Sequence, residues 1–119
     1  SGQTAGLSGS SWKLVSFGAV NDPTPAVADI DTSLLFDEKG QISGNLGCNG
    51  FGGKYAVKDD TVTFSEVIST MMACAEPQMT QEGTAFKVLN GTARYTLDGD
   101  TLQIIDSSGE SALRFERIK

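Results

Sequence analysis

The segment SGNLGCNGFGGKY (Ser43–Tyr55) concentrates glycine around one cysteine and one asparagine. Three explanations compete for it: a phosphate-binding loop, a metal or redox site, and an architectural turn. A phosphate-binding loop places its glycines between a strand and a helix, whose N-terminus directs amide groups at the anion. Here the strand-like pattern KYAV follows the glycines, and no Ser or Thr follows Gly53-Lys54. We therefore interpret the segment as a tight or bulged reversal that needs positive φ at several glycines, with Asn49 capping the local backbone.

Strand patterns of period two surround this segment. SLLF-DEKG-QISGNL (33–46) predicts strand, turn and strand, with Leu34, Phe36 and Ile42 facing inward. ARYTL-DG-DTLQII (93–105) predicts a hairpin with Asp98-Gly99 as a type I′ pair.

The first strand pattern is SWKLVSF (11–17), which carries the chain's one tryptophan. Strict alternation predicts two faces for it. One face is expected to carry Trp12, Leu14 and Ser16, and the other Lys13, Val15 and Phe17.

Residues 77–90 break the strand rhythm and predict a helix. Its expected apolar face consists of Met79, Phe86 and Leu89. Pro77 suits the first turn, Glu76 and Glu82 are expected toward the positive end of the helix, and Gly91 fits the left-handed position that follows it. With about eight short strands, the fold class is mainly β (α+β): an antiparallel sheet curled into a partly closed barrel, with the helix packed against it.

The 119 residues suffice for one domain. SGQTAGLSGSS (1–11) is rich in Gly and Ser and predicts a flexible leader, which could tether the domain to a lipid anchor further upstream. Residues 12–119 then form the single domain. No apolar run approaches the roughly 18 residues that a membrane-spanning helix needs.

Composition argues against several classes of function. The net charge of −6 disfavours nucleic acid and anionic lipid as partners. Histidine, the commonest metal ligand and neutral-pH general base, is absent. The carboxylate pairs Asp59-Asp60 and Asp98/Asp100 lie in predicted turns, where aspartate is favoured for its backbone geometry. We therefore expect no enzymatic activity, no cofactor and no metal.

Cys48 and Cys74 are the two cysteines. An even number of cysteines in a small all-β domain with an export-like leader favours a disulfide, and a pair of buried free thiols remains the alternative. Met71, Met72, Met79 and Cys74 are soft ligands that suit Cu(I), but we expect these methionines to fill irregular core space beneath the helix.

Taken together, these motifs resemble the META domain of the HslJ type. The resemblance rests on Trp12 with Leu14, LLFDEKGQISGNLGCNGFGGKY, STMMAC, Glu82, and YTLDGDTLQI, and it covers Trp12 to about Phe115. It assigns structural rather than catalytic roles to the motif positions Trp12, Gly47, Cys48, Asn49, Gly50, Gly53, Tyr55, Cys74 and Glu82.

The resemblance implies an exported envelope protein, often a lipoprotein, associated with heat shock and with resistance to novobiocin. We expect a monomeric, non-enzymatic domain of the periplasm, the outer membrane or the secreted fraction, with a role in stress or antibiotic tolerance. Its partner would be an envelope protein or a small hydrophobic ligand. The alternatives are a carrier, holding a lipid or hydrophobic molecule between sheet and helix, and an inhibitor of a secreted hydrolase.

Overall fold

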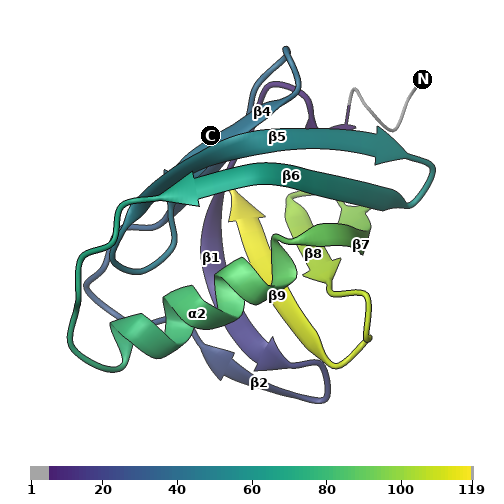
Figure 1. Cartoon of the computed structure of the whole chain (residues 1–119). Coiled ribbons are helices and arrows are strands. Elements are labelled where there is room, and N and C mark those ends of the chain that lie inside the picture. The colour runs from purple at the N-terminus through teal and green to yellow at the C-terminus, as the bar shows by residue number, and fades with distance from the viewer. Residues whose placement is uncertain (1–5, 119) are drawn as a thin grey trace.

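The computed structural model describes residues 6–118, in which nine strands form one antiparallel sheet accompanied by helix α2 (Figure 1). The elements are β1 (Ser10–Ala19), β2 (Asp22–Pro25), β3 (Ser33–Phe36), β4 (Gln41–Asn45), β5 (Gly50–Lys58), β6 (Thr61–Ser69), α2 (Gln78–Val88), β7 (Gly91–Asp98), β8 (Thr101–Ile105) and β9 (Ser111–Arg117). No helix in the described part of the chain is long and apolar enough to cross a membrane.

Strand β1 closes the sheet into a barrel. Its residues Ser10–Trp12 pair with β3, and Trp12–Ala19 pair with β9. Eight strands therefore form a closed barrel, while β2 pairs with Ser16–Ala19 and lies outside it. The predicted mainly β fold with about eight barrel strands and a helix is confirmed, and closure removes most of the exposed sheet edge.

Large apolar side chains fill the barrel. Leu34, Phe36 and Ile42 are buried, as the alternation predicts. The ring of Phe36 meets that of Tyr55 edge to face, with centroids 4.9 Å apart. Each such buried side chain contributes about 1.5–3 kcal/mol relative to an exposed one. The interior is thus a packed core.

A bulge in β1 makes part of the prediction of which side chains face the core wrong. The register with β9 shifts between Leu14 and Ser16, which leaves Val15 as an extra residue. The extra residue shifts the alternation by one position, so Phe17 is buried in the core instead of lying on the outer face with Val15.

Residues 6–11 also differ from the prediction of a flexible leader. Leu7 is fully buried in the core, and β1 already begins at Ser10. The Ser10 hydroxyl donates to the carbonyl of Leu7 and accepts the indole N–H of Trp12 at 2.7 Å. A single Leu among Gly and Ser carries no periodic signal, yet here it completes the core. The other predicted leader residues, 1–5, lie outside the described residues.

The hairpin between β7 and β8 is confirmed, but its turn lies one residue further along the chain. Asp98 pairs with Thr101, so Gly99 and Asp100 are the two central residues. Gly99 has φ +62°, whereas Asp98 does not lie in the left-handed region. Glycine at the first central position is typical of a type II′ turn, not of the predicted type I′ turn.

Helix α2 begins and ends close to the predicted positions. The Glu76 carboxylate accepts hydrogen bonds from the backbone N–H and hydroxyl of Thr80, at 3.0 and 2.6 Å, and so supports the first turn. Gly91 follows the helix with φ +70°. Glu82, however, lies in the middle of the helix and is buried. The buried face consists of Gln81, Glu82, Ala85 and Val88, whereas the predicted apolar residues Met79 and Phe86 are half-buried.

The turn between β8 and β9 is organised by Asp106. Its Oδ1 accepts hydrogen bonds from the Ser108 hydroxyl at 2.7 Å and from the backbone N–H groups of Gly109, Glu110 and Ser111 at 3.0, 3.3 and 3.4 Å. Burial raises the pKa of Asp106, but these hydrogen bonds favour the carboxylate more, so its pKa lies below the ordinary value.

Asp106→Asn is expected to lower the free energy of unfolding by about 1–2 kcal/mol near neutral pH, because a neutral amide oxygen accepts these hydrogen bonds more weakly than a carboxylate oxygen does. A depressed pKa in the folded state means that the carboxylate stabilises fully above about pH 4 and loses its effect as the pH falls further. Urea titrations at pH 7 and pH 2 should therefore show that the difference in free energy of unfolding between wild type and variant is smaller at pH 2. Glu110→Gln, an exposed change in the same turn, is the control; a difference that persists unchanged in acid contradicts the assignment.

Candidate functional site

The buried carboxylate of Glu82 lies against the glycine-rich segment. Its Oε2 accepts the backbone N–H groups of Cys48 and Asn49, at 2.9 and 2.5 Å, and its Oε1 accepts the Asn49 side-chain amide at 2.7 Å. This approach requires Gly47, since a Cβ there would lie 2.9 Å from the carbonyl oxygen of Gln78 and 3.1 Å from the Cβ of Glu82. The segment's amides thus bind a carboxylate from their own chain.

Asn49 connects the glycine-rich segment to a distant part of the chain. Its Oδ1 accepts the Thr70 hydroxyl and the Met72 N–H, both at 2.8 Å, and its Nδ2 also donates to the Met72 carbonyl at 3.2 Å. The prediction that Asn49 caps local backbone is therefore wrong. Asn45 performs that role: its Oδ1 accepts the N–H of Gly47 and its Nδ2 donates to the carbonyl of Cys48, both at 3.0 Å.

The structure contains the disulfide that the sequence favoured. Cys48 and Cys74 are bonded, with their Cα atoms 6.2 Å apart. Together with Asn49 and Glu82 they form what we call the latch, which joins the glycine-rich segment, helix α2 and the connection between β6 and α2. Both cysteine sulfurs are engaged, so neither is available as a thiolate ligand for copper.

Gln81, which the sequence patterns above did not single out, strengthens the same junction. Its side chain is fully buried. Its Nε2 donates to the carbonyl of Leu46 at 2.9 Å, and its Oε1 accepts the N–H of Val27 at 2.7 Å. The available signal was the pair of adjacent polar residues Gln81 and Glu82 at the centre of the predicted helix. Buried polar side chains are hydrogen-bonded, so such a pair, if buried, indicates bonds to other parts of the chain.

The remaining motif positions lie in the barrel. Trp12 is fully buried, and the guanidinium of Arg117 lies 4.5 Å from its ring centroid. The Tyr55 hydroxyl donates to the Asp37 carbonyl at 2.6 Å, and burial raises the pKa of this phenol.

Gly50 and Gly53 belong to β5. A Cβ at Gly53 would lie 2.9 Å from Cγ2 and 3.0 Å from Cα of Val67, so only glycine fits beneath β6 there. A Cβ at Gly50 would lie 3.9 Å from the carbonyl oxygen of Gly44, an ordinary contact, and the carbonyl of Gly50 accepts the N–H of Thr70 at 3.1 Å. These two glycines support the strand pairing, and neither has positive φ. The prediction of positive φ at several glycines of the segment is therefore wrong, since among them Gly44 alone has it.

An exposed apolar segment begins in the last two residues of β6 and continues beyond the strand, and we define it as Ile68–Met72. The exposed fractions are 73% for Ile68, 92% for Met71 and 59% for Met72. The prediction that these methionines fill the core is wrong, because Asn49 and the disulfide hold the backbone against the barrel while the side chains turn outward. Such concentrated apolar exposure is typical of an interaction surface.

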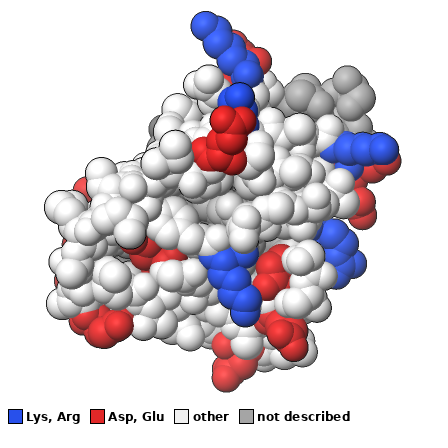
Figure 2. All heavy atoms as spheres, viewed as in Figure 1, with Lys and Arg blue, Asp and Glu red and all other residues white. Residues whose placement is uncertain are grey.

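Two of the grooves that flank the barrel are bordered by residues from outside the barrel strands. One, of about 450 Å³, separates β6 from α2 and is lined by Phe64, Ser65, Glu66, Val67, Ser69, Phe86, Leu89 and Asn90. The surface is hollowed between this strand and the helix, and charged side chains lie above and below the hollow (Figure 2).

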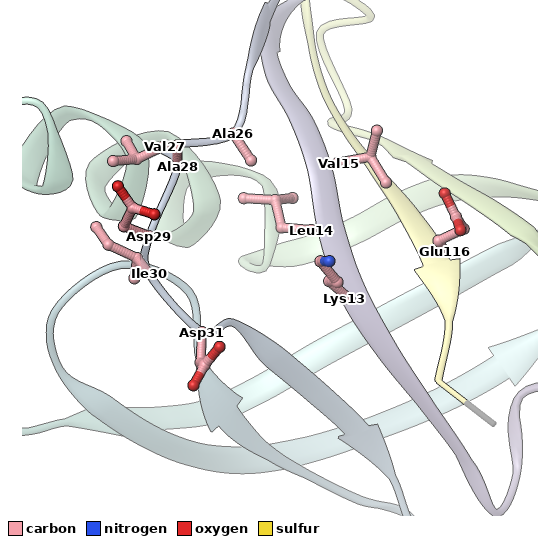
Figure 3. A pocket seen from close by; sticks show the side chains of 10 residues that line it. All are labelled: Lys13, Leu14, Val15, Ala26, Val27, Ala28, Asp29, Ile30, Asp31 and Glu116. Carbon is pink, nitrogen blue, oxygen red and sulfur yellow. The ribbon is translucent and has the colours of Figure 1, made fainter.

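The other groove, of about 560 Å³, lies between β1 with β9 on one side and residues 26–31 on the other (Figure 3). Lys13 faces it together with Asp29, Asp31 and Glu116, so acidic groups outnumber basic ones. Within residues 6–118, no three His, Cys, Asp or Glu side chains gather in an arrangement that could hold a metal ion.

Fold and latch define a small, disulfide-bonded β-barrel domain with a helix fastened to it. The chain belongs to the META domain family, whose model matches residues 5–119. No protein with a curated description matches it.

Solved structures share the fold. A protein from Burkholderia xenovorans, determined by NMR, is 24% identical with a TM-score of 0.80, covering 99% of this chain and 88% of its own. A DUF4847 family protein from Bacteroides vulgatus ATCC 8482, in a crystal structure at 1.00 Å, is 14% identical with a TM-score of 0.65, covering 92% of this chain and 93% of its own. At these identities the likeness establishes the architecture alone.

Proposed function

We propose that this chain is a non-enzymatic, extracytoplasmic envelope domain that acts in stress or antibiotic tolerance by contacting a partner protein. The Cys48–Cys74 disulfide supports this location, because disulfides persist in oxidising compartments and are rare in reducing ones. Membership of the META domain family is consistent with the same location.

The saturated bonding of the latch supports a non-enzymatic role. Both carboxylate oxygens of Glu82 accept hydrogen bonds from the protein, and the Asn49 amide is bonded through both its oxygen and its nitrogen. A general base or nucleophile needs a lone pair directed at substrate. In the latch these groups hold parts of the fold together instead.

The exposure of the apolar segment is the observation that carries the proposed contact. Disordered loops lose affinity because they must be ordered on binding, whereas Asn49 and the disulfide already hold Ile68–Met72 in place. Methionine also adapts its shape to a partner surface. A partner protein can therefore bury Met71 and Met72 with little reorganisation of this domain.

Replacing Met71 and Met72 together by glutamate is expected to change the free energy of unfolding by less than about 0.5 kcal/mol, since both side chains are exposed. The double variant should nevertheless fail to restore tolerance to heat or novobiocin in a strain that lacks this chain. Survival, scored at matched protein levels, is the measurement. Leu35→Glu, an exposed apolar position on β3, is the control and should restore wild-type survival. Full rescue by the double variant would exclude the apolar segment as the contact surface.

A carrier of hydrophobic molecules is the second candidate, and the groove between β6 and α2 favours it. Phe64, Phe86 and Leu89 supply an apolar lining there, whereas the barrel interior is occupied by its own side chains. Native mass spectrometry of protein isolated from cells separates the two functions, because a carrier should retain a bound molecule. The inhibitor alternative receives no comparable support, since the glycine-rich segment is held down by Glu82 and the disulfide.

A further inference from the structure

Strand β6 is paired on both sides only along its first half. Its register with β5 runs from Thr61 to Ser69, but its register with β7 ends at Phe64 opposite Gly91. Beyond that pair, the neighbouring element is helix α2 (Figure 1). We define Ser65–Ser69 as the free edge.

The register shows which backbone groups point away from β5. Thr70 donates its N–H to Gly50, and Ile68 is paired with Gly52. In an antiparallel ladder, alternate residues direct their N–H and C=O groups to opposite sides. Val67 and Ser69 therefore direct theirs away from β5, toward the groove beside α2.

The floor of this groove is apolar. Val67 is half-buried against the core, and Phe86 of α2 and Leu89, which follows the helix, also line the groove. A chain running beside the free edge would direct alternate side chains onto this floor, because successive residues of a strand face opposite ways. Apolar residues suit those positions.

The outer face carries a different signal. Glu66 is exposed there with φ +54° at the bulge of β6, and Lys54 lies 3.0 Å from its carboxylate. Glu66 is the charged residue among those that line the groove, and the whole chain carries a net charge of −6. Basic side chains on the outward positions of an added strand would complement both.

We propose that the free edge of β6 binds an extended segment of a partner protein as an added strand, with apolar residues facing α2 and basic residues facing outward. This inference rests on the proposed function, in which a partner protein is contacted, and it specifies the chemistry of that partner. The free edge shares Ile68 and Ser69 with the apolar segment, so one partner can cover both. Main-chain hydrogen bonds to Val67 and Ser69 would hold the segment, and the groove would select its side chains.

A blocked six-residue peptide of alternating valine and lysine is a suitable probe for this site. Titrated into the full chain at low salt, it should shift the backbone amide signals of Ser65–Ser69 and the side-chain signals of Phe86 and Leu89. The same peptide with its backbone N-methylated, or with glutamate in place of lysine, should bind at least about tenfold more weakly. Equal binding by the N-methylated peptide would overturn the proposal.

Ser69→Pro and Ser69→Ala form a matched pair of variants. Proline removes the N–H that points to the groove, whereas alanine keeps it. The Pro variant should bind the valine–lysine peptide at least about tenfold more weakly, and the Ala variant should bind within about twofold of wild type. Amide spectra check that each variant is folded. If the Pro variant is unfolded, the comparison with the N-methylated peptide on the wild-type chain decides whether the peptide binds as an added strand.

Two results separate this inference from the proposed function. If the Met71 and Met72 double variant loses tolerance while Ser69→Pro is folded and keeps both tolerance and peptide binding, the partner contact stands and strand addition is wrong. If the peptide shifts only the signals of protein residues that line the acidic groove of Figure 3, strand addition is also wrong.

Discussion

Replacing Glu82 by alanine is expected to lower the free energy of unfolding by about 3–5 kcal/mol. The change leaves three donors without their acceptor: the backbone N–H groups of Cys48 and Asn49 and the Asn49 side-chain amide. Because Asn49 is itself buried, water replaces the carboxylate poorly. Urea denaturation followed by fluorescence of Trp12 measures the loss. The dependence of the free energy of unfolding on urea concentration should stay unchanged if the barrel otherwise persists.

Glu82→Gln should be intermediate, because its one acceptor oxygen can take the place of Oε2 and accept both backbone N–H groups, which leaves its NH₂ group facing the Asn49 side-chain amide, a donor. Glu76→Gln is the matched control at the start of the same helix: its carboxylate is exposed and accepts hydrogen bonds from Thr80. Glu76→Gln should lower the free energy of unfolding by less than about 0.5 kcal/mol. A loss below about 1 kcal/mol for Glu82→Ala would show that Glu82 does not hold the latch together.

Features that depend on neighbouring residues were predictable. Leu34, Phe36 and Ile42 face inward because their strands keep strict alternation around a short turn. Gly91 takes positive φ because the chain must leave the helix there. Mainly β architecture followed from the same local signals.

Features that depend on pairing across the sheet were not predictable. The bulge at Val15 exists because β1 must follow β9, and nothing in SWKLVSF marks an extra residue. The turn at Gly99 moved by one residue because the register of β7 with β8 decides which residues are central. Leu7 is buried because the barrel leaves space for it, which no pattern of eleven Gly- and Ser-rich residues reveals.

The candidate site divides in the same way. Cys48 and Cys74 were paired correctly from their number and the expected compartment. Asn49 was assigned a local role because asparagine usually bonds nearby backbone, yet its partners lie beyond β5 and β6. Met71 and Met72 point outward because of that long-range bonding. The composition does not reveal the bonding, and an argument from composition therefore placed both side chains in the core.

Breaking the Cys48–Cys74 bond is expected to lower the free energy of unfolding by about 3 kcal/mol, since the bond closes a loop with a sequence separation of 26. Replacing both cysteines by serine should have the same effect as reductant on wild type, and reductant should then change nothing further. Denaturant titrations of both proteins, with and without reductant, provide the measurement. An unchanged midpoint for wild type in reductant would mean that the bond does not constrain the unfolded chain.

The same variant also tests how the apolar segment works. Asn49 still bonds Thr70 and Met72 without the disulfide, so the barrel should persist while amide exchange rises between Ser69 and Cys74. A loosened segment must be ordered when a partner binds, which weakens the contact although Met71 and Met72 are unchanged. Tolerance should therefore be lost at temperatures where circular dichroism still reports a folded barrel. Full tolerance in a variant whose segment exchanges rapidly would show that the partner does not need a preordered surface.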